Sequence, residues 1–276
     1  MIFRSLPGRR ETAHFTTAEL RSSFLIDDLF QPGEIRLAGT DLDRAIVGGA
    51  IPLASPLPLP VDPELRADFF TQRREVGIIN LGGAGSVHVD EEKFSVGTRE
   101  CLYVGRGNHS ITFASDDASS PAVFYIVSYP AHAEYPTRLA KASDANIVSL
   151  GSKELANERK IYQYIHENGI KSCQLVLGYT ELATGSVWNT MPPHTHTRRS
   201  EVYCYFDIPE GQRVLHLMGE PQETRSIWMA NRSVVLSPAW SIHSGAGTSA
   251  YRFVWAMGGE NQRFDDMDGV PIGDLR

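Results

Sequence analysis

The chain lacks any apolar run that approaches the roughly 18 residues needed to cross a bilayer, and its start, MIFRSLPGRRETAHF, lacks the apolar segment of a signal peptide. It has only three cysteines, Cys101, Cys173 and Cys204, which lie far apart and form no CxxC pair. Reduced thiols are the simplest interpretation of this cysteine content. We therefore expect a cytoplasmic protein with no membrane partner.

Positive charge is also scarce. Lys and Arg total 26 against 33 Asp and Glu, which gives a formal net charge of −7 and a pI near 5.7. Nucleic-acid binding relies on a basic surface, so this balance argues against a nucleic-acid partner. An anionic ligand would need a local group of basic side chains.

Helical periodicity is weak, and short β-rich runs bounded by turn residues take its place. One series of runs lies within residues 76–129 and a second within residues 172–257, while residues 136–170 read as a polar linker with a short helix. Short strands at this spacing predict a sandwich or barrel rather than βαβ units. We expect an all-β fold with a few short helices and two similar domains, residues 1–140 and 141–276.

A weak internal repeat supports the two-domain prediction. TQRREVGIIN at residues 71–80 is similar to TRRSEVYCYF at residues 197–206, and this alignment pairs Glu75 with Glu201. The similarity is low, but it suggests that each domain carries a version of the same strand.

The stretch MPPHTHTRRSEVYCYFD, residues 191–207, places His194 and His196 one residue apart. Alternate residues of a strand point to one face, so the two imidazoles would project side by side. A turn near residues 198–200 must re-aim Glu201, and only the fold can bring His243 to the others. A lone HxH pair is more often a surface pair, but three imidazoles with a carboxylate suit zinc, iron, manganese or nickel.

The first domain cannot repeat this set. The repeat places Asp68 and Phe70 opposite the two histidines of the HxH pair, and His109 opposite His243. We therefore expect a metal site in the second domain and none in the first.

These motifs resemble those of known proteins. The pattern H-x-H-x4-E followed by P-x-W-x-x-H resembles the two metal motifs of the cupins, with Trp240 where the second motif usually has glycine. A narrower resemblance, over nearly the whole chain, is to the 5-keto-4-deoxyuronate isomerase family (4-deoxy-L-threo-5-hexosulose-uronate ketol-isomerases). It is carried by VWNTMPPHTHTRRSEVYCYF, GEPQETR, SPAWSIHSGAGT, GENQRFDDMDGV, IVGGAIPL, RREVGIINLGGAGSV and FASDDASSPAVFY.

The resemblance implies a bicupin, that is, two tandem double-stranded β-helix barrels assembled as a homohexamer. It also implies one Zn²⁺ per chain, held by His194, His196, Glu201 and His243. The implied reaction converts 5-dehydro-4-deoxy-D-glucuronate to 3-deoxy-D-glycero-2,5-hexodiulosonate in pectin and uronate catabolism. The partner would then be a small anionic sugar.

That reaction also needs a cation for the substrate carboxylate and a group that moves a proton. Arg198, Arg199 and Arg225 are the candidate substrate-binding residues, since a guanidinium grips a carboxylate with two hydrogen bonds, although ordinary salt bridges would explain them equally well. We rank Arg199 first. Tyr203 and Tyr205 share the strand face of Glu201, so either could relay a proton, although core packing is the commoner fate of such residues. Arg199 and Tyr203 are our candidate catalytic residues.

Three further interpretations remain open at this point. The alternating residues Tyr251, Phe253, Trp255 and Met257 read as barrel core. The second is a cupin dioxygenase, since three histidines and a glutamate also suit iron. The third is a cupin that binds a sugar without catalysis.

Overall fold

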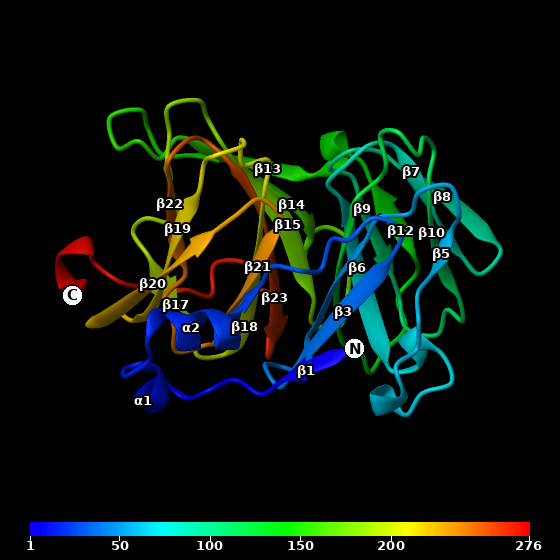
Figure 1. The fold of residues 1–276 in the computed structure, drawn as a ribbon, viewed down its shortest axis with the longest axis horizontal. Helices are drawn as coiled ribbons and strands as arrows, with labels where there is room; N and C mark the ends of the chain where they lie inside the picture. The colour runs from blue at the N-terminus through cyan, green and yellow to red at the C-terminus, as the bar shows by residue number, and fades with distance from the viewer. The chain divides into compact units, whose positions relative to one another are not determined.

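A computed structural model describes residues 1–276, which divide into two compact units. The first unit comprises Met1–Arg4, Asp28–Ala145 and Tyr164–Val176, and the second comprises Ser5–Asp27, Asn146–Gln163 and Leu177–Arg276. Each unit therefore includes a segment from beyond the boundary expected near residue 140. Figure 1 labels α1, α2 and most of the strands.

The first unit contains two sheets. The larger has seven strands in the spatial order β1 (Ile2–Arg4), β3 (Ile35–Thr40), β4 (Ile46–Ala50), β11 (Phe124–Pro130), β6 (Arg74–Asn80), β9 (Cys101–Val104) and β12 (Arg138–Ala140). The smaller has four strands in the order β5 (Leu57–Pro58), β10 (Ile111–Ser115), β7 (Gly85–Val89) and β8 (Glu92–Val96).

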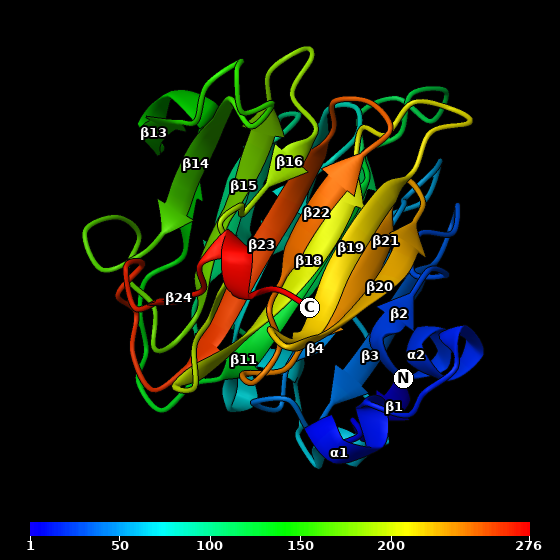
Figure 2. The ribbon, with the colours of Figure 1, turned by 90° about the vertical axis from the view of Figure 1, so that its left-hand side faces the viewer.

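The second unit repeats this plan. Its larger sheet has the order β13 (Asn146–Leu150), β14 (Arg159–Ile165), β15 (Val176–Leu182), β23 (Arg252–Gly259), β18 (Arg199–Phe206), β21 (Ser233–Ser237) and β2 (Leu25–Ile26). Its smaller sheet has the order β16 (Trp188–Asn189), β22 (Ser244–Gly247), β19 (Val214–Glu220) and β20 (Glu223–Met229). Figure 2 shows the smaller sheet lying across the face of the larger one. A separate short ladder joins β17 (His194–Thr195) to β24 (Asp268–Gly269).

The two units correspond strand by strand. The run β4-β11-β6-β9 in the first has the same connectivity as β15-β23-β18-β21 in the second, and the two four-stranded sheets match as well. The all-β class and the tandem double-sheet arrangement expected from the sequence are confirmed.

Helices are few and short. They are α1 (Arg9–Thr12), α2 (Thr17–Phe24) and the 3₁₀ turns η1 (Pro63–Leu65), η2 (Phe70–Gln72), η3 (Ala142–Asp144) and η4 (Ile272–Asp274). A capping box starts α2, since Thr16 Oγ1 accepts from the Glu19 amide and the Glu19 carboxylate accepts from the Thr16 amide. None of these helices has the length and apolar character of a membrane-spanning segment.

The linker expected for residues 136–170 is wrong. That stretch forms β12, β13 and the whole of β14, and its only helical element is the 3₁₀ turn η3. Strand β13 is exposed along nearly its whole length, although Ile147, Val148 and Leu150 are apolar.

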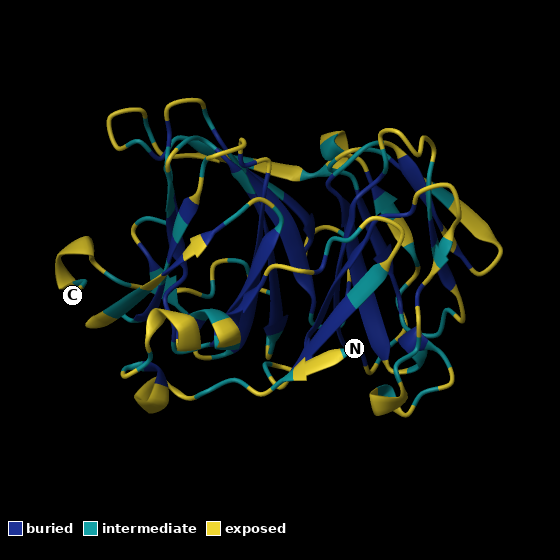
Figure 3. Cartoon of the chain, viewed as in Figure 1, coloured by how far each residue is buried: buried dark blue, intermediate teal, exposed yellow.

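The interior of the first unit is apolar. Val76 and Ile78 of β6 pack in one cluster with Leu102, Phe113 and Phe124, and all five are fully buried. Burying side chains of this kind contributes about 1.5–3 kcal/mol each. Figure 3 shows the buried strands of both units in dark blue and the exposed loops in yellow.

The pairing of Glu75 with Glu201 inferred from the repeat is wrong by one residue, because the two side chains point to opposite faces of their sheets. Because strand residues alternate, Glu75 points away from the face that carries Val76 and Ile78. Its carboxylate accepts hydrogen bonds from the Tyr103 hydroxyl (2.8 Å) and from the backbone amides of residues 173, 174 and 175 (2.7–2.9 Å). Glu75 is thus a buried hydrogen-bond acceptor that links β6 to β9 and to residues 173–175 of the first unit.

Candidate metal centre

Local structure brings the three clustered site residues together. His194 opens β17, and His196 follows that strand. A turn at residues 197–198 reverses the chain so that Glu201 enters β18, where it faces Ser237 of β21 on one side and Met257 of β23 on the other. The turn expected near residues 198–200 is therefore present, one residue earlier.

His243 reaches the same place from the four-stranded sheet. It directly precedes β22, whose register against β19 is set from Ser244 onward. The turn before it is held by a hydrogen bond from the Ser241 amide to the Pro238 carbonyl (2.9 Å). The two sheets of the second unit thus supply opposite sides of one site.

The four side chains converge. The Nε2 atoms of His196 and His243 lie 3.0 and 2.8 Å from the same oxygen of Glu201, and the Nε2 atoms of His243 and His194 lie 2.9 Å apart. One potential ligand atom from each residue falls within 4.8 Å of all the others. His196, Glu201 and His243 are buried, and His194 is half-buried.

Neighbouring groups orient two of the imidazoles. Nδ1 of His196 lies 2.8 Å from the Arg199 carbonyl, which can only accept, so this nitrogen donates; in the neutral imidazole, Nε2 then carries no proton and can bind a metal. Nδ1 of His243 lies 3.3 Å from Ser237 Oγ. The Arg199 carbonyl thus fixes the tautomer of His196 that presents Nε2 to a metal, and Ser237 helps to orient the His243 ring.

The electrostatics also suit a cation. Burial, with help from His243, lowers the pKa of His194 to about 2, so this imidazole is neutral near pH 7. Burial opposes the charge of Glu201, but His243 and His196 outweigh it and lower the pKa of this carboxyl group. Burial likewise opposes a charge on His196, yet its hydrogen bond to Glu201 raises its pKa. A buried carboxylate surrounded by imidazoles is the donor set of a divalent metal.

A cavity of about 220 Å³ opens beside this group. Its volume suits a small molecule rather than a polymer. It is lined by Leu150, Arg159, Ile161, Thr180, Thr190, Met191, Pro192, His194, Arg199, Glu201, Tyr203, Phe253, Trp255, Met257, Phe264 and Met267.

The cavity revises the interpretation of β23. Phe253, Trp255 and Met257 are buried as expected of core residues, but they also form one wall of this cavity. The prediction that this strand face is core is confirmed, and the lining of the cavity is an additional role.

Of the three arginines expected to bind substrate, only Arg199 lines the cavity. Its Nη1 donates to the Arg263 carbonyl, and its Nη2 donates to the carbonyls of Phe264 (3.2 Å) and Asp266 (3.1 Å). Both hydrogens of Nη2 are therefore used, and no adjacent pair of N–H groups remains to grip a carboxylate with two hydrogen bonds.

Arg198 and Arg225 lie outside the cavity lining. Arg198 is ion-paired with Asp266 (2.6 Å) and Asp268 (3.0 Å). Arg225 lies in β20, 3.8 Å from the Glu223 carboxylate. The structure therefore does not bring these two arginines to the metal group.

Tyr203 does line the cavity. Its ring centroid lies 5.4 Å from that of His243, and its hydroxyl lies 3.1 Å from Thr190 Oγ1. Burial and the charge of Glu201 raise the pKa of Tyr203 well above its ordinary value, so the hydroxyl keeps its proton. Tyr205 instead directs its hydroxyl to His216 Nδ1, at 2.7 Å.

Sequence reasoning missed several cavity residues. Arg159 and Ile161 alternate along β14, in the stretch read as a linker, and this alternation was the available signal. Phe264 and Met267 come from an irregular loop between β23 and β24, where no periodicity marks them.

Comparison with known proteins places the chain in a family. Residues 40–270 match the KduI/IolB family. A 4-deoxy-L-threo-5-hexosulose-uronate ketol-isomerase of Lachnoclostridium phytofermentans is 52% identical over 276 residues, which cover 100% of both chains. One of Formosa agariphila is 54% identical over 262 residues, 95% of this chain and 94% of the relative.

Solved structures share the fold at low identity. An IolB-like protein of Salmonella typhimurium has a TM-score of 0.74 at 16% identity, covering 90% of this chain and 96% of its own. Oxalate decarboxylase of Bacillus subtilis has a TM-score of 0.55 at 12% identity, covering 79% and 69%. These likenesses concern the fold alone. The family resemblance carried by the sequence motifs is confirmed by the closer relatives: the chain belongs to the KduI/IolB family.

Proposed function

We propose that this protein is a metal-dependent ketol-isomerase that converts 5-dehydro-4-deoxy-D-glucuronate to 3-deoxy-D-glycero-2,5-hexodiulosonate in uronate catabolism. Relatives about half identical over the full chain bear the name of such an isomerase. The observation that carries the proposal is the convergent group of three histidines and one glutamate at the wall of a small cavity.

We propose His194, His196, Glu201 and His243 as the ligands of one divalent metal per chain, and zinc as that metal. The three imidazoles, the carboxylate and their burial fit the binding of a divalent metal of this kind. When bound, the metal would polarise the C1 carbonyl and C2 hydroxyl of the substrate and make the C2 proton more acidic.

Tyr203 is the proposed proton-transfer residue. The isomerisation moves one proton from C2 to C1 and one from O2 to O1, with no atom gained or lost. Apart from the proposed ligands and two arginines, Tyr203 is the only cavity-lining side chain with an ionisable proton. Its hydroxyl is protonated at rest and hydrogen-bonded to Thr190, so it can donate to a substrate oxygen and be re-protonated.

Arg199 takes a positioning role in this proposal. Its three hydrogen bonds hold the loop that carries Phe264 against the cavity, which helps to exclude water from the site.

Assembly and location are further parts of the proposal. The family resemblance supports a homohexamer, and the separated cysteines support a cytoplasmic location. Sedimentation equilibrium of the purified protein would measure the assembly, and a monomer at micromolar concentration would contradict it.

The test of the reaction uses metal-stripped protein that is reloaded with zinc. Proton NMR of the uronate should show the aldehyde signal fall while hydroxymethyl signals rise, with the metal-stripped protein inactive. An oxygen electrode in the same mixture should register no consumption. Zinc-loaded protein that leaves the aldehyde untouched would overturn the isomerase assignment, and oxygen uptake by an iron-loaded sample would favour the dioxygenase alternative.

A further inference from the structure

The metal-site cavity contains one arginine, Arg159, that has two adjacent N–H groups free to bind a carboxylate. Arg159 and Arg199 are the only basic residues besides histidine in its lining. Arg199 has its terminal nitrogens engaged by backbone carbonyls. Arg159 makes a single hydrogen bond, from Nη1 to the Asn157 carbonyl (2.8 Å), so Nε and Nη2 remain available on the same side of the guanidinium.

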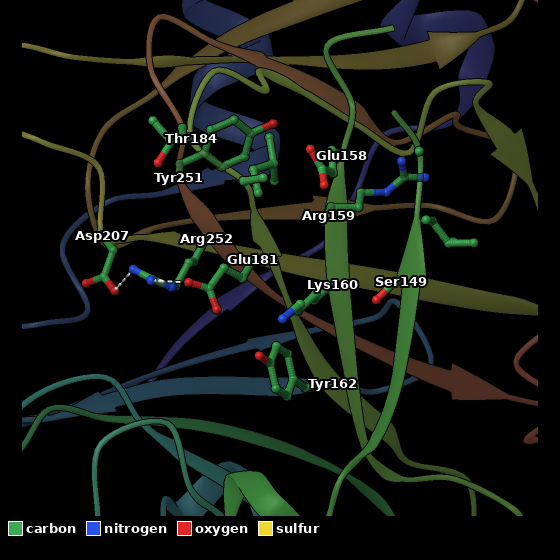
Figure 4. Close-up of a pocket in the computed structure, with 15 residues that line it drawn as sticks. Ser149, Glu158, Arg159, Lys160, Tyr162, Glu181, Thr184, Asp207, Tyr251 and Arg252 are labelled. Carbon is green, nitrogen blue, oxygen red and sulfur yellow. Dashed lines mark hydrogen bonds and ion pairs between the residues drawn. The ribbon is translucent and has the colours of Figure 1, made fainter. Parts of the chain in front are cut away.

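Arg159 also has no carboxylate partner. The one carboxylate in the cavity lining, Glu201, is bound by His196 and His243. A second cavity of about 590 Å³ adjoins the first, with Leu150 and Arg159 in both linings. In that cavity Arg252 pairs with Asp207 and Glu181, and Figure 4 shows Arg159 extending from β14 away from this trio.

The surroundings of Arg159 favour an anionic ligand. Burial is the main cause that lowers the pKa of Arg159, while the nearby hydroxyls of Tyr203 and Tyr251 act in the opposite direction. A partly buried guanidinium has lost part of its hydration and gains from an anion that restores two hydrogen bonds. Because Tyr203 lines the metal-site cavity, this cation lies among the groups proposed to handle the substrate.

From this arrangement we propose that Arg159 binds the carboxylate at the end of the substrate remote from the metal, and so sets the specificity for uronates over neutral sugars. The assignment rests on the proposed isomerase function. It replaces Arg199 as the carboxylate-binding residue and leaves the metal ligands unchanged.

The test compares the uronate with its methyl ester, which keeps the carbon skeleton and loses the charge. In Arg159→Leu, kcat/KM for the uronate should fall about 30-fold or more, as expected for removal of one partner of a buried ion pair. The ester should be a poor substrate for the wild type and should change less than about 3-fold in the variant. Metal content should stay the same, and Arg159→Lys should restore part of the preference for the uronate.

Arg213→Leu serves as the matched control, because Arg213 is exposed and its guanidinium contacts only the neighbouring Gln212 carbonyl. Equal losses on uronate and ester in Arg159→Leu, or no loss on the uronate, would overturn the assignment. Loss of the preference in Arg199→Lys with Arg159→Leu unaffected would overturn it as well.

Calorimetry separates this inference from the isomerase proposal. The wild type should bind the uronate more tightly than the ester, and Arg159→Leu should abolish the difference, whether or not turnover occurs. If the metal-loaded wild type binds with this preference but does not isomerise the uronate, the isomerase proposal fails and the carboxylate site stands. If the wild type binds both compounds equally, the carboxylate site fails.

Discussion

At the scale of single residues, side chains of the same type differ in their hydrogen-bond partners, and the sequence does not show this difference. Arg198 forms ion pairs with two carboxylates, and Arg199 donates hydrogen bonds to three backbone carbonyls. Arg159, in contrast, has two adjacent nitrogens, Nε and Nη2, without hydrogen-bond partners. The paired tyrosines of β18 divide in the same way, because Tyr203 reaches the cavity and Tyr205 is engaged with His216.

The first prediction concerns the proposed metal ligands. His196→Ala and His243→Ala should each reduce bound metal from about one per chain to near zero, because each removes one of four donors from the site. Inductively coupled plasma mass spectrometry of dialysed protein measures this directly. His88→Ala, at an exposed position of β7, should keep its full metal content. Unchanged metal in folded His196→Ala and His243→Ala proteins would refute the ligand assignment.

The second prediction concerns Tyr203. Tyr203→Phe should lower kcat by about 10²–10⁴-fold, the range that general acid–base groups contribute, with metal content unchanged. Steady-state kinetics on the uronate gives the value. Tyr162→Phe, on β14 and outside the metal-site cavity, is the control and should keep wild-type kcat. Wild-type kcat in Tyr203→Phe would remove this residue from the mechanism.

At the scale of elements, the loop at residues 260–267 closes the cavity although it has almost no regular structure of its own. Its shape depends on Arg198 and Arg199, which bind its backbone and its acidic side chains, and on the ladder between β17 and β24. The acidic residues at the end of this loop, Asp265, Asp266 and Asp268, are thus partly neutralised by Arg198.

The third prediction follows from that loop. Arg199→Leu should destabilise the protein by about 2–3 kcal/mol, since three backbone carbonyls lose their donor. Hydrogen–deuterium exchange of residues 260–267 should accelerate more than exchange elsewhere. The exposed control Arg213→Leu should leave the exchange of this loop unchanged. Wild-type protection of the loop in Arg199→Leu would show that other contacts hold it.

The fourth prediction concerns β6 in the first unit. Glu75→Leu should cost about 3–5 kcal/mol in urea unfolding, because three backbone amides and the Tyr103 hydroxyl lose their acceptor in a buried place. Glu75→Gln should cost less, since it keeps one acceptor oxygen. The matched change Glu92→Leu, at an exposed position of β8, should have little effect. A loss of less than about 1 kcal/mol in the free energy of unfolding for Glu75→Leu would contradict the stabilising role of these buried hydrogen bonds.

At the scale of the whole molecule, one sheet plan is used twice with different interiors. In the first unit the strand face of β6 that points inward carries Val76 and Ile78, and in the second unit the inward face of β18 carries Glu201 and Tyr203. The expectation that the second unit holds a metal and the first holds none remains a prediction.

The fifth prediction is the number and place of the metals. Anomalous scattering from zinc-loaded crystals should show one peak per chain, beside His196 and His243, and none near Glu75. An additional peak in the first unit would contradict the expectation that residues 1–140 hold no metal.

The sequence by itself determined the fold class and the candidate metal ligands. Alternating short runs can satisfy their backbone and bury one face only as sheets, and the HxH pair with Glu201 is set by local strand and turn geometry. Both features depend on residues close together in the chain, so a single sequence displays them.

Only the tertiary structure decided the rest. It confirmed that His243 joins the other three residues, which depends on two sheets facing each other. It corrected the pairing of Glu75 with Glu201, because a shift of one residue moves a side chain to the opposite face of a strand. It also shows that Arg159, rather than Arg199, keeps free hydrogen-bonding groups at the cavity, since those groups depend on carbonyls from distant segments that no local pattern records.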